Sequence, residues 1–466
     1  MNPRILLCVA LTVLALPAVP APAQTPPASR EAVRQSFAPV VKKAAPAVVN
    51  VYSKRVVQTQ SPFLNDPFFR RFFGDAFRLA LPRERVMNSL GSGVIVDPSG
   101  LIVTNHHVIE SAQEVTVVLS DRREFPARII LDDQHVDLAV LLIDVGNEKL
   151  PTLEIGDSDK LEVGDLVMAI GNPFGVGQTV TMGIVSALAR TGVGIGDFGA
   201  YVQTDAAINP GNSGGALVDL DGRLVGINTA IYSESGGSVG IGFAIPTGLV
   251  RSVLDAARKG KTFVQRPYLG IAGESVSVDE AKKIGLDHPT GVLIDDVQAD
   301  SPAAKAGVAK GDVILAIDGH DVDDAESLRF RLATIDVGTQ AHLTVWRGGQ
   351  ARDVVAALTA PPEQPPREVT KIAGNTPFTG ASVGNLNPAF AEELNLPQTL
   401  RGVVVSAVAP GSPADRIGFQ PGDVVLKLNN RKIETVVQLR DALGKSQSSW
   451  IIVLGRGGKT VTIAVR

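Results

Sequence analysis

The sequence of 466 residues predicts a mainly β protein, with one large β-rich region followed by two copies of a smaller domain. At roughly 150 residues per domain, the length is enough for about three domains. Between residues 24 and about 260, β-branched runs such as GSGVIVD, GLIVTN and DLAVLLI alternate with turn signals, which is typical of a β-barrel or sandwich. Apolar residues at 44% and charged residues at 20% are the composition of a soluble globular protein.

The charge excludes one class of partner. A net charge of −4, with dispersed acidic residues, provides no basic surface for a phosphate backbone. We therefore expect no nucleic acid as the main partner.

Residues 1–23 predict a cleaved secretory signal peptide. One Arg precedes an apolar run at residues 5–16, and the small residues at 21–23 match a cleavage site. The alternative is a membrane anchor, but the run is shorter than the ~20 apolar residues that span a bilayer. We therefore expect an exported protein, periplasmic in a two-membrane bacterium, with no stable membrane span. Because Cys8 is the only Cys, the mature chain would form no disulfide and use no Cys chemistry.

Two composition breaks predict the domain boundaries. The basic stretch ARKGKTFVQRP ends the β-rich region, and PPEQPP forms a stiff, extended linker by its proline content. These breaks predict a first domain at 24–262, a second at 263–360, a linker at 361–370 and a third domain at 371–466.

The last two domains are copies of each other. GVLIDDVQADSPAAKAGVAKGDVILAIDG, from Gly291, aligns with GVVVSAVAPGSPADRIGFQPGDVVLKLNN, from Gly402. Ser301 recurs as Ser412 at the same offset of 111. Each copy carries its own strands, Ser-Pro helix start and Gly-Asp turn, so it is a complete domain and not one repeat of a solenoid.

The stretch GNSGGALVD contains Ser213, which is either a nucleophile or a polar residue in a glycine-rich turn. It matches the G-x-S-x-G elbow of α/β-hydrolases, which requires a helix after the Ser and a later His. Instead, the residues around Asp221-Gly222 alternate and predict a β-hairpin with a type I′ turn. The later histidines all lie in the repeated domains: His288, His320 and His342. The elbow is excluded.

The β-rich region holds three histidines before Ser213. His135 lies in the polar stretch DDQHVD and is expected in a solvated loop. His106 and His107, in TNHHVI, follow an apolar run, so one of them lies at a strand end, where a rigid element can hold a catalytic group. A serine nucleophile needs such an imidazole as its base.

A serine mechanism of this kind also needs a buried carboxylate that orients the imidazole. Asp132 and Asp133 form a surface-like pair. Asp137 instead begins the apolar run LAVLLI, and a buried carboxylate requires a hydrogen-bond partner such as an imidazole N–H.

These motifs resemble a known family. TNHHVI, DLAVL and GNSGGAL resemble the three signatures of chymotrypsin-fold serine proteases, and DAAINPGNSGGAL with IGFAIP and two repeats is similar to the HtrA/Deg family of secreted quality-control proteases. The resemblance covers essentially the whole mature chain. It implies a chymotrypsin-like double β-barrel protease domain followed by two PDZ domains. Its T-x-x-H pattern implies His107, and not His106, as the base, with Asp137 as the orienting acid and Ser213 as the nucleophile.

The resemblance also implies an oxyanion hole and a substrate pocket. The N–H groups of Gly211 and Ser213 would form the hole, where preorganised donors typically contribute about 3 kcal/mol each, and Gly214-Gly215 would let the substrate backbone approach. Ile208 and Ile231 would line an apolar pocket for small aliphatic side chains, although both are equally plausible as core residues.

The two PDZ-like copies differ at one loop. In the first copy YLGI matches the family's carboxylate-binding loop, whereas the second copy has FTGA, at residues 378–381, in the equivalent place. PDZ domains bind a peptide by strand addition, so we expect hydrophobic C-terminal peptides and unfolded polypeptides as partners. A purely structural docking role is the alternative for both copies. The first loop consists of Tyr268, Leu269, Gly270 and Ile271.

A phenylalanine-rich insertion at residues 63–77 holds six of the chain's 16 Phe. A loop this short does not readily bury so many aromatic rings. The family's corresponding loop reaches a neighbouring active site in a trimer, so we expect a homo-oligomer, either a trimer or a multiple of trimers. Local packing on the barrel is the alternative.

Taken together, the sequence predicts an ATP-independent serine endopeptidase for unfolded or misfolded exported proteins, assisted by its PDZ domains. The alternative is a peptide-binding chaperone or scaffold with a resting protease site. We expect no cofactor, since GVGIGDFG is not a strand-to-helix turn for a nucleotide, and no Cys or His cluster suggests a metal.

Overall fold

The computed structural model describes residues 36–58, 84–173, 177–190, 198–209, 211–231, 238–394, 396–444 and 449–465. The predicted signal peptide and the phenylalanine-rich insertion lie outside these residues. Within them, no helix combines the length and the apolar character needed to cross a membrane.

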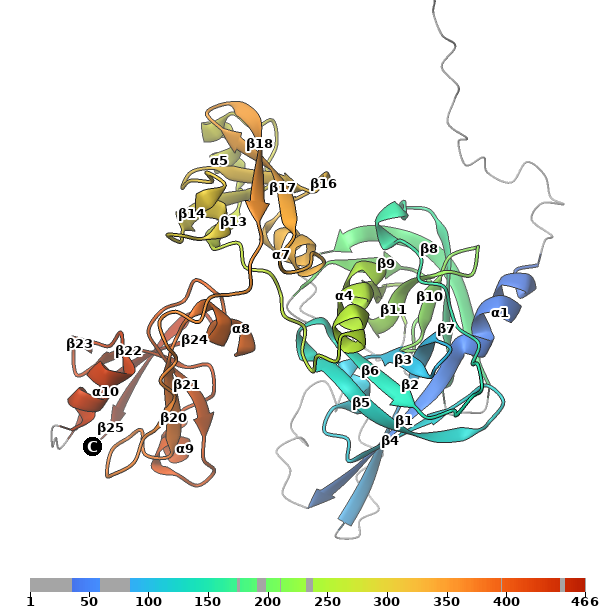
Figure 1. Cartoon of the computed structure of the whole chain (residues 1–466), viewed down its shortest axis with the longest axis horizontal. Helices are drawn as coiled ribbons and strands as arrows, with labels where there is room; N and C mark the ends of the chain where they lie inside the picture. The colour runs from blue at the N-terminus through green and yellow to red at the C-terminus, as the bar shows by residue number, and fades with distance from the viewer. Residues whose placement is uncertain are drawn as a thin grey trace, which may run out of the picture. The chain divides into compact units, whose positions relative to one another are not determined.

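The first six strands close into a barrel in the order β1-β2-β3-β6-β5-β4 (Figure 1). Its interior is aliphatic, because runs such as LIVT and LAVLLI supply side chains that are almost all buried. The elements are α1 (Ala38–Ala44), η2 (Ala45–Ala47), β1 (Val48–Gln58), β2 (Glu84–Asp97), β3 (Leu101–Thr104), α3 (His106–Ile109), β4 (Glu114–Val118), β5 (Glu124–Asp133), η5 (Gln134–Val136) and β6 (Leu138–Ile143).

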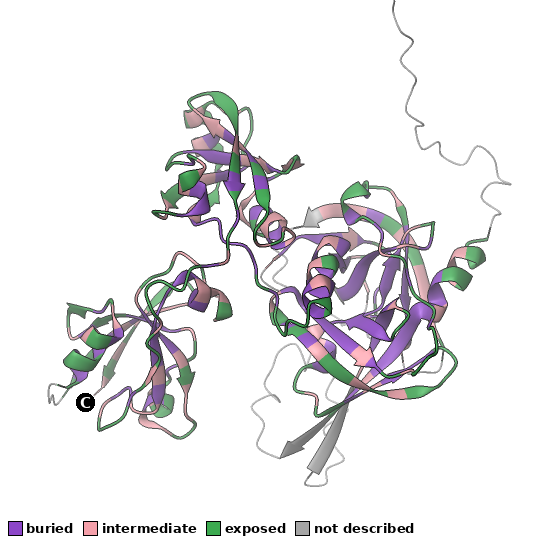
Figure 2. Ribbon diagram, viewed as in Figure 1, coloured by how far each residue is buried: buried purple, intermediate pink, exposed green. Residues whose placement is uncertain are grey.

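The next six strands close into a second barrel in the order β10-β11-β12-β9-β8-β7. Figure 2 shows that most strands of both barrels are largely buried, whereas β5 and β8 are mostly intermediate or exposed. The elements are η6 (Ser158–Lys160), β7 (Leu166–Gly171), β8 (Thr179–Arg190), β9 (Tyr201–Thr204), β10 (Ala216–Val218), β11 (Leu224–Ile231), β12 (Gly242–Pro246) and α4 (Thr247–Arg258).

The hairpin expected after Ser213 is present, since β10 pairs antiparallel with β11. Its predicted type I′ turn is wrong. Only Gly222, and not Asp221, has a positive φ, and the Gly222 N–H donates to the Asp219 carbonyl at 3.0 Å. The Asp219 carboxylate also accepts from the Asp221 N–H at 2.9 Å, which stabilises a three-residue loop that ends in the left-handed Gly222.

Two sheets of matching order follow the barrels. The first is β13-β14-β15-β17-β18 with β16 beside β15, and the second is β20-β21-β22-β24-β25 with β23 beside β22 and an added strand, β19, beside β20. The first repeat comprises β13 (Ile271–Ser275), α5 (Val278–Ile284), β14 (Val292–Val297), α6 (Pro302–Lys305), β15 (Val313–Ile317), β16 (His320–Asp321), α7 (Ala325–Ala333), β17 (Gln340–Arg347) and β18 (Gln350–Ala357). The second comprises β19 (Thr370–Lys371), β20 (Ala381–Asn385), α8 (Pro388–Glu393), β21 (Val403–Val408), α9 (Pro413–Ile417), β22 (Val424–Leu428), β23 (Arg431–Lys432), α10 (Val436–Leu443), β24 (Trp450–Arg456) and β25 (Lys459–Val465).

The repeated Gly-Asp turn has the same partner in both copies. Asp312 is buried and its carboxylate accepts from Arg347 at 2.5 Å, while the equivalent Asp423 accepts from Arg456 at 2.6 Å. A buried carboxylate is costly without a partner, so the Gly-Asp turn and its arginine partner recur together.

The predicted linker at 361–370 is too long at its C-terminal end. Thr370 already belongs to β19, and the Arg367 carbonyl accepts from the Asn385 N–H at 2.6 Å. Backbone pairing to β20 therefore begins inside the segment that proline content alone assigned to a linker.

Candidate active site

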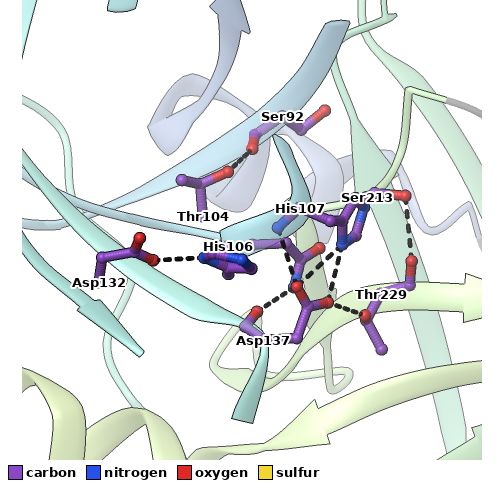
Figure 3. Close-up of polar contacts among 9 residues, drawn as sticks. Ser92, Thr104, His106, His107, Asp132, Asp137, Ser213 and Thr229 are labelled. Atoms are coloured by element: carbon purple, nitrogen blue, oxygen red, sulfur yellow. Dashed lines mark hydrogen bonds and ion pairs between the residues drawn. The ribbon is translucent and has the colours of Figure 1, made fainter. Parts of the chain in front are cut away.

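His107 and Asp137 meet at the end of the first barrel. His107 is in α3, directly after β3, and Asp137 lies in the turn between η5 and β6. The His107 Nδ1 atom is 2.8 Å from Asp137 Oδ2, and the His107 backbone N–H donates to Asp137 Oδ1 at 3.0 Å (Figure 3). Asp137 has a φ of 54°, a left-handed conformation that Asp tolerates better than most residues.

Thr229 is a third partner of this pair, and the sequence reading missed it. Its Oγ1 donates to Asp137 Oδ2 at 2.6 Å, from β11 in the other barrel. Asn105 adds a bond from its Nδ2 to the Asp137 carbonyl at 2.9 Å. The available signal was a polar Asn-Thr pair within the otherwise apolar run LVGINTAI, because a buried Thr needs a hydrogen-bond partner.

These contacts keep Asp137 ionised. Burial alone would raise its pKa, but the charge of His107 and the hydrogen bonds from His107 and Thr229 outweigh burial and place the pKa below its ordinary value. An anionic carboxylate accepts a hydrogen bond from Nδ1–H, so the proton stays on Nδ1 and the imidazole presents Nε2 as its acceptor.

Ser213 lies beside His107 in Figure 3, on the turn that precedes β10. Its Oγ donates to the Thr229 carbonyl at 3.1 Å. Among the described residues, no hydrogen bond joins it to His107. Thr229 thus bonds to Asp137 through its side chain and to Ser213 through its backbone. Catalytic hydrogen bonds are often unmade without substrate, so this rotamer is compatible with a nucleophile.

The turn that carries Ser213 is attached to the first barrel by one residue of β2. The Ser92 N–H donates to the Ser213 carbonyl at 2.8 Å, and Ser92 Oγ donates to the Gly211 carbonyl at 2.6 Å. In the described part of the chain, neither the Gly211 N–H nor the Ser213 N–H donates a hydrogen bond. The Gly211 and Ser213 carbonyls therefore bond to β2, and the N–H groups of the same two residues stay available.

The sequence suggested that Gly214 and Gly215 let the substrate backbone approach, but the structure gives these two glycines a different reason. Both are buried, and a Cβ on Gly214 would lie 2.1 Å from the Ser92 carbonyl oxygen. A Cβ on Gly215 would lie 2.3 Å from the Ile170 carbonyl oxygen. The protein's own backbone excludes a side chain at both positions.

The remaining acid and base candidates are arranged differently. His106 Nδ1 is 2.7 Å from Asp132 Oδ1, and this hydrogen bond raises the pKa of His106. The prediction of a surface-like acidic pair is wrong for Asp133, which is buried and whose Oδ1 accepts from the His135 N–H at 3.1 Å. His135 is half-buried in η5 and not a freely solvated loop residue.

The pocket residues stay a prediction. The Ile208 side chain is 1% exposed, in a buried cluster with Leu217 and Ala244 of the second barrel. Ile231 ends β11, and its side chain lies outside the described part of the structure.

Comparisons with known proteins match this architecture. The description "Trypsin-like peptidase domain" matches residues 91–227, and "PDZ domain" matches residues 267–358 and 404–456. The chain is 38% identical to the periplasmic pH-dependent serine endoprotease DegQ of Escherichia coli, over 92% of this chain and 91% of the relative. It is 37% identical to the periplasmic serine endoprotease DegP of Salmonella typhimurium, over 92% of each. Among solved structures, the HtrA-type protease AlgW with decapeptide is 45% identical, with a TM-score of 0.52 over 70% of this chain and 99% of that one.

Proposed function

The chain belongs to the HtrA/Deg family of serine endoproteases, and from this premise we propose that it cleaves unfolded or misfolded exported proteins in the periplasm without ATP. The observation that carries the proposal is the pairing of His107 with the buried Asp137, with Ser213 on the adjoining turn. The alternative of a chaperone with a resting site is not favoured, since the matched relatives are named endoproteases.

The chemistry is acyl transfer by a serine nucleophile. Ser213 Oγ turns from the Thr229 carbonyl towards His107, which takes its proton at Nε2 as Oγ attacks the scissile carbonyl carbon. Asp137 holds the imidazole in the required tautomer and stabilises the imidazolium that forms. The tetrahedral intermediate then collapses, and His107 donates the proton to the leaving amine. Water, deprotonated by the same imidazole, hydrolyses the acyl-enzyme.

The negative charge that develops on the carbonyl oxygen needs donors that are already in place. The N–H groups of Gly211 and Ser213 fill this role, because neither donates to a described residue. The Gly215 N–H also holds the Asn212 carbonyl at 2.9 Å, which fixes the peptide plane that carries the Ser213 N–H. Such preorganised donors are typically worth about 3 kcal/mol each in the transition state.

Substrate selection is divided between pocket and repeats. A pocket lined by Ile208 and Ile231, as the family resemblance implies, would favour small aliphatic side chains, and the YLGI loop of the first repeat would bind hydrophobic C-terminal peptides. We expect assembly into trimers, or multiples of trimers, because the phenylalanine-rich insertion corresponds to the family's loop between subunits. Light scattering of the purified chain measures that assembly.

The test is a Ser213→Ala variant. We expect loss of nearly all cleavage of unfolded casein, in the absence of ATP, while circular dichroism stays unchanged. A fluorophosphonate should label the wild-type protein at Ser213 and leave the variant unlabelled. Undiminished proteolysis by the variant would refute the proposal.

A further inference from the structure

The first repeat leaves one edge of its sheet unpaired in the described part of the structure. β13 ends the strand order and bonds only to β14. Directly before it, the N–H groups of Leu269 and Gly270 donate no hydrogen bond to any described residue. Ile271 of β13 and Leu332 of α7 are only half-buried. This edge has unused donors and incompletely buried apolar side chains.

The second repeat has the same edge, but it is filled. β19 pairs antiparallel with β20, with Thr370 opposite Val383 and Lys371 opposite Ser382. The Ile372 N–H continues the ladder and donates to the Ala381 carbonyl at 2.8 Å. In the second repeat, a strand of the same chain therefore pairs with the sheet edge that stays unpaired in the first repeat.

This strand ends at the loop FTGA. The Gly380 N–H donates to the Ile372 carbonyl at 3.0 Å, and the Thr379 N–H donates to the Thr376 carbonyl at 3.1 Å. The N–H of Ala381 donates to the Phe378 carbonyl at 2.9 Å. The N–H groups of Thr379, Gly380 and Ala381 are therefore already used by the chain itself.

The two loops are equivalent in structure despite their different sequences. Gly270 and Gly380 have φ values of 79° and 92°, and a Cβ on either would lie 2.3 Å from the Cβ of Ser301 or Ser412, respectively. The comparison between the two edges therefore involves the same backbone position in each repeat.

The burial of the side chains also shows that the sheet edge of the second repeat is covered. Ile372 is 6% exposed and belongs to the buried cluster that includes Phe378 and Leu443. Ala381 and Leu443, which correspond to the half-buried Ile271 and Leu332 of the first repeat, are both buried. An apolar side chain therefore covers the edge in the second repeat.

We propose that residues 370–372 are a built-in ligand of the second repeat, bound by strand addition as a C-terminal peptide would be, so that this repeat takes no external peptide. Ile372 supplies the terminal apolar side chain, and its carbonyl oxygen accepts from the loop in place of a terminal carboxylate. The inference rests on the proposed peptide binding by the PDZ domains and assigns that role to the first repeat.

The first experiment counts peptides bound to the full chain, carrying Ser213→Ala to prevent cleavage. A fluorescent decapeptide with an apolar, free C-terminus should saturate at one per chain, and Gly270→Val should reduce this to none. Two per chain in the parent protein would overturn the inference. No binding at all would instead contradict the proposed peptide recruitment. The cross-linking experiment below would then still test whether residues 370–372 occupy the edge of the second repeat.

The second experiment removes the internal strand. Ile372→Pro deletes the N–H that bonds to Ala381 and should raise the stoichiometry from one to two, whereas the control Lys371→Ala keeps the backbone and should leave it at one. Trp450 is buried in the second repeat, so its emission, in a Trp346→Phe background, reports whether that repeat stays folded. A folded Ile372→Pro variant that still binds one peptide contradicts the inference.

The third experiment keeps the internal strand in place and therefore does not depend on how the proline variant folds. The described chain contains no Cys, and Lys371 lies opposite Ser382, so a Lys371→Cys/Ser382→Cys protein should form a disulfide on mild oxidation. In hydrogen exchange, the Gly380 amide should be protected without peptide and the Gly270 amide only after peptide is added. No cross-link, together with rapid exchange at Gly380, would overturn the inference even if the proline variant failed to fold.

Discussion

Two histidine–aspartate pairs connect α3 to the β5–β6 region, but only one lies at the serine. The His107–Asp137 pair adjoins Ser213, and its carboxylate is 11% exposed. The His106–Asp132 pair has a similar Nδ1-to-oxygen distance, with a carboxylate that is 39% exposed. A similar distance between histidine and aspartate therefore does not give the two pairs the same catalytic role. The surroundings of each carboxylate determine that role.

The difference lies in how firmly each carboxylate is held. Asp137 accepts hydrogen bonds from the His107 ring, the His107 N–H and Thr229 Oγ1. For Asp132 the described residues provide the His106 ring alone. A carboxylate with several fixed donors keeps the imidazole in one orientation, which general-base catalysis requires.

The largest expected effect separates the two carboxylates directly. Asp137→Asn should lower kcat about 10³- to 10⁴-fold, because a neutral amide no longer selects the tautomer with Nε2 as acceptor. Asp132→Asn should change kcat by less than about threefold, since an exposed pair contributes little. Steady-state kinetics on an unfolded substrate measures both. Similar losses in the two variants would contradict the assignment.

A second, smaller effect tests the hydrogen bond from Thr229 Oγ1, which Asp137 accepts and Asp132 does not. Thr229→Val removes Oγ1 but keeps the carbonyl that bonds to Ser213, and should lower kcat about tenfold, the value of one hydrogen bond to a charged group. Thr229→Ser restores the hydroxyl and should recover most of the rate. A Ser variant as slow as the Val variant would mean that Thr229 acts through packing.

A third effect uses the charge of His106. The hydrogen bond to Asp132 outweighs burial and raises the pKa of His106, with smaller contributions from the charges of Asp132, Asp137 and Glu110, so His106 stays cationic to higher pH. Asp132→Asn should therefore lower the pKa of His106, and Asp132→Glu should lower it less, as followed by NMR titration of the His106 ring. An unchanged His106 pKa in Asp132→Asn would contradict this cause.

The smallest effect is on stability. Because folding raises the pKa of His106, its contribution is fully present below the unfolded value of about 6.5 and is lost as the pH rises through the folded value. His106→Asn should lower Tm by about 1–3 °C at pH 5.5 and by less at pH 8.5. Thermal unfolding followed by circular dichroism measures this. A Tm difference that grows with pH would reverse the sign and contradict the argument.

Much of the fold and part of the site could be predicted from local patterns. The alternation of apolar residues after Ser213 predicted a strand and excluded the hydrolase elbow, and the buried run after Asp137 indicated a carboxylate in need of a partner. The bonds from Ser92 and Thr229 could not be predicted this way, since each joins residues that are far apart in sequence and meet only when both barrels close. β19 was missed for another reason: two residues, Thr-Lys, carry no periodicity.

Ser92 has a consequence for recombination between relatives. Its hydroxyl and its N–H, both on a strand of the first barrel, bond to the two carbonyls that flank Asn212 in the second. A chimaera that takes its front half from one homologue and its back half from another inherits a working junction only if position 92 keeps a hydroxyl on a strand in the same register. The natural crossover points for shuffling this enzyme therefore lie after the barrels, not between them.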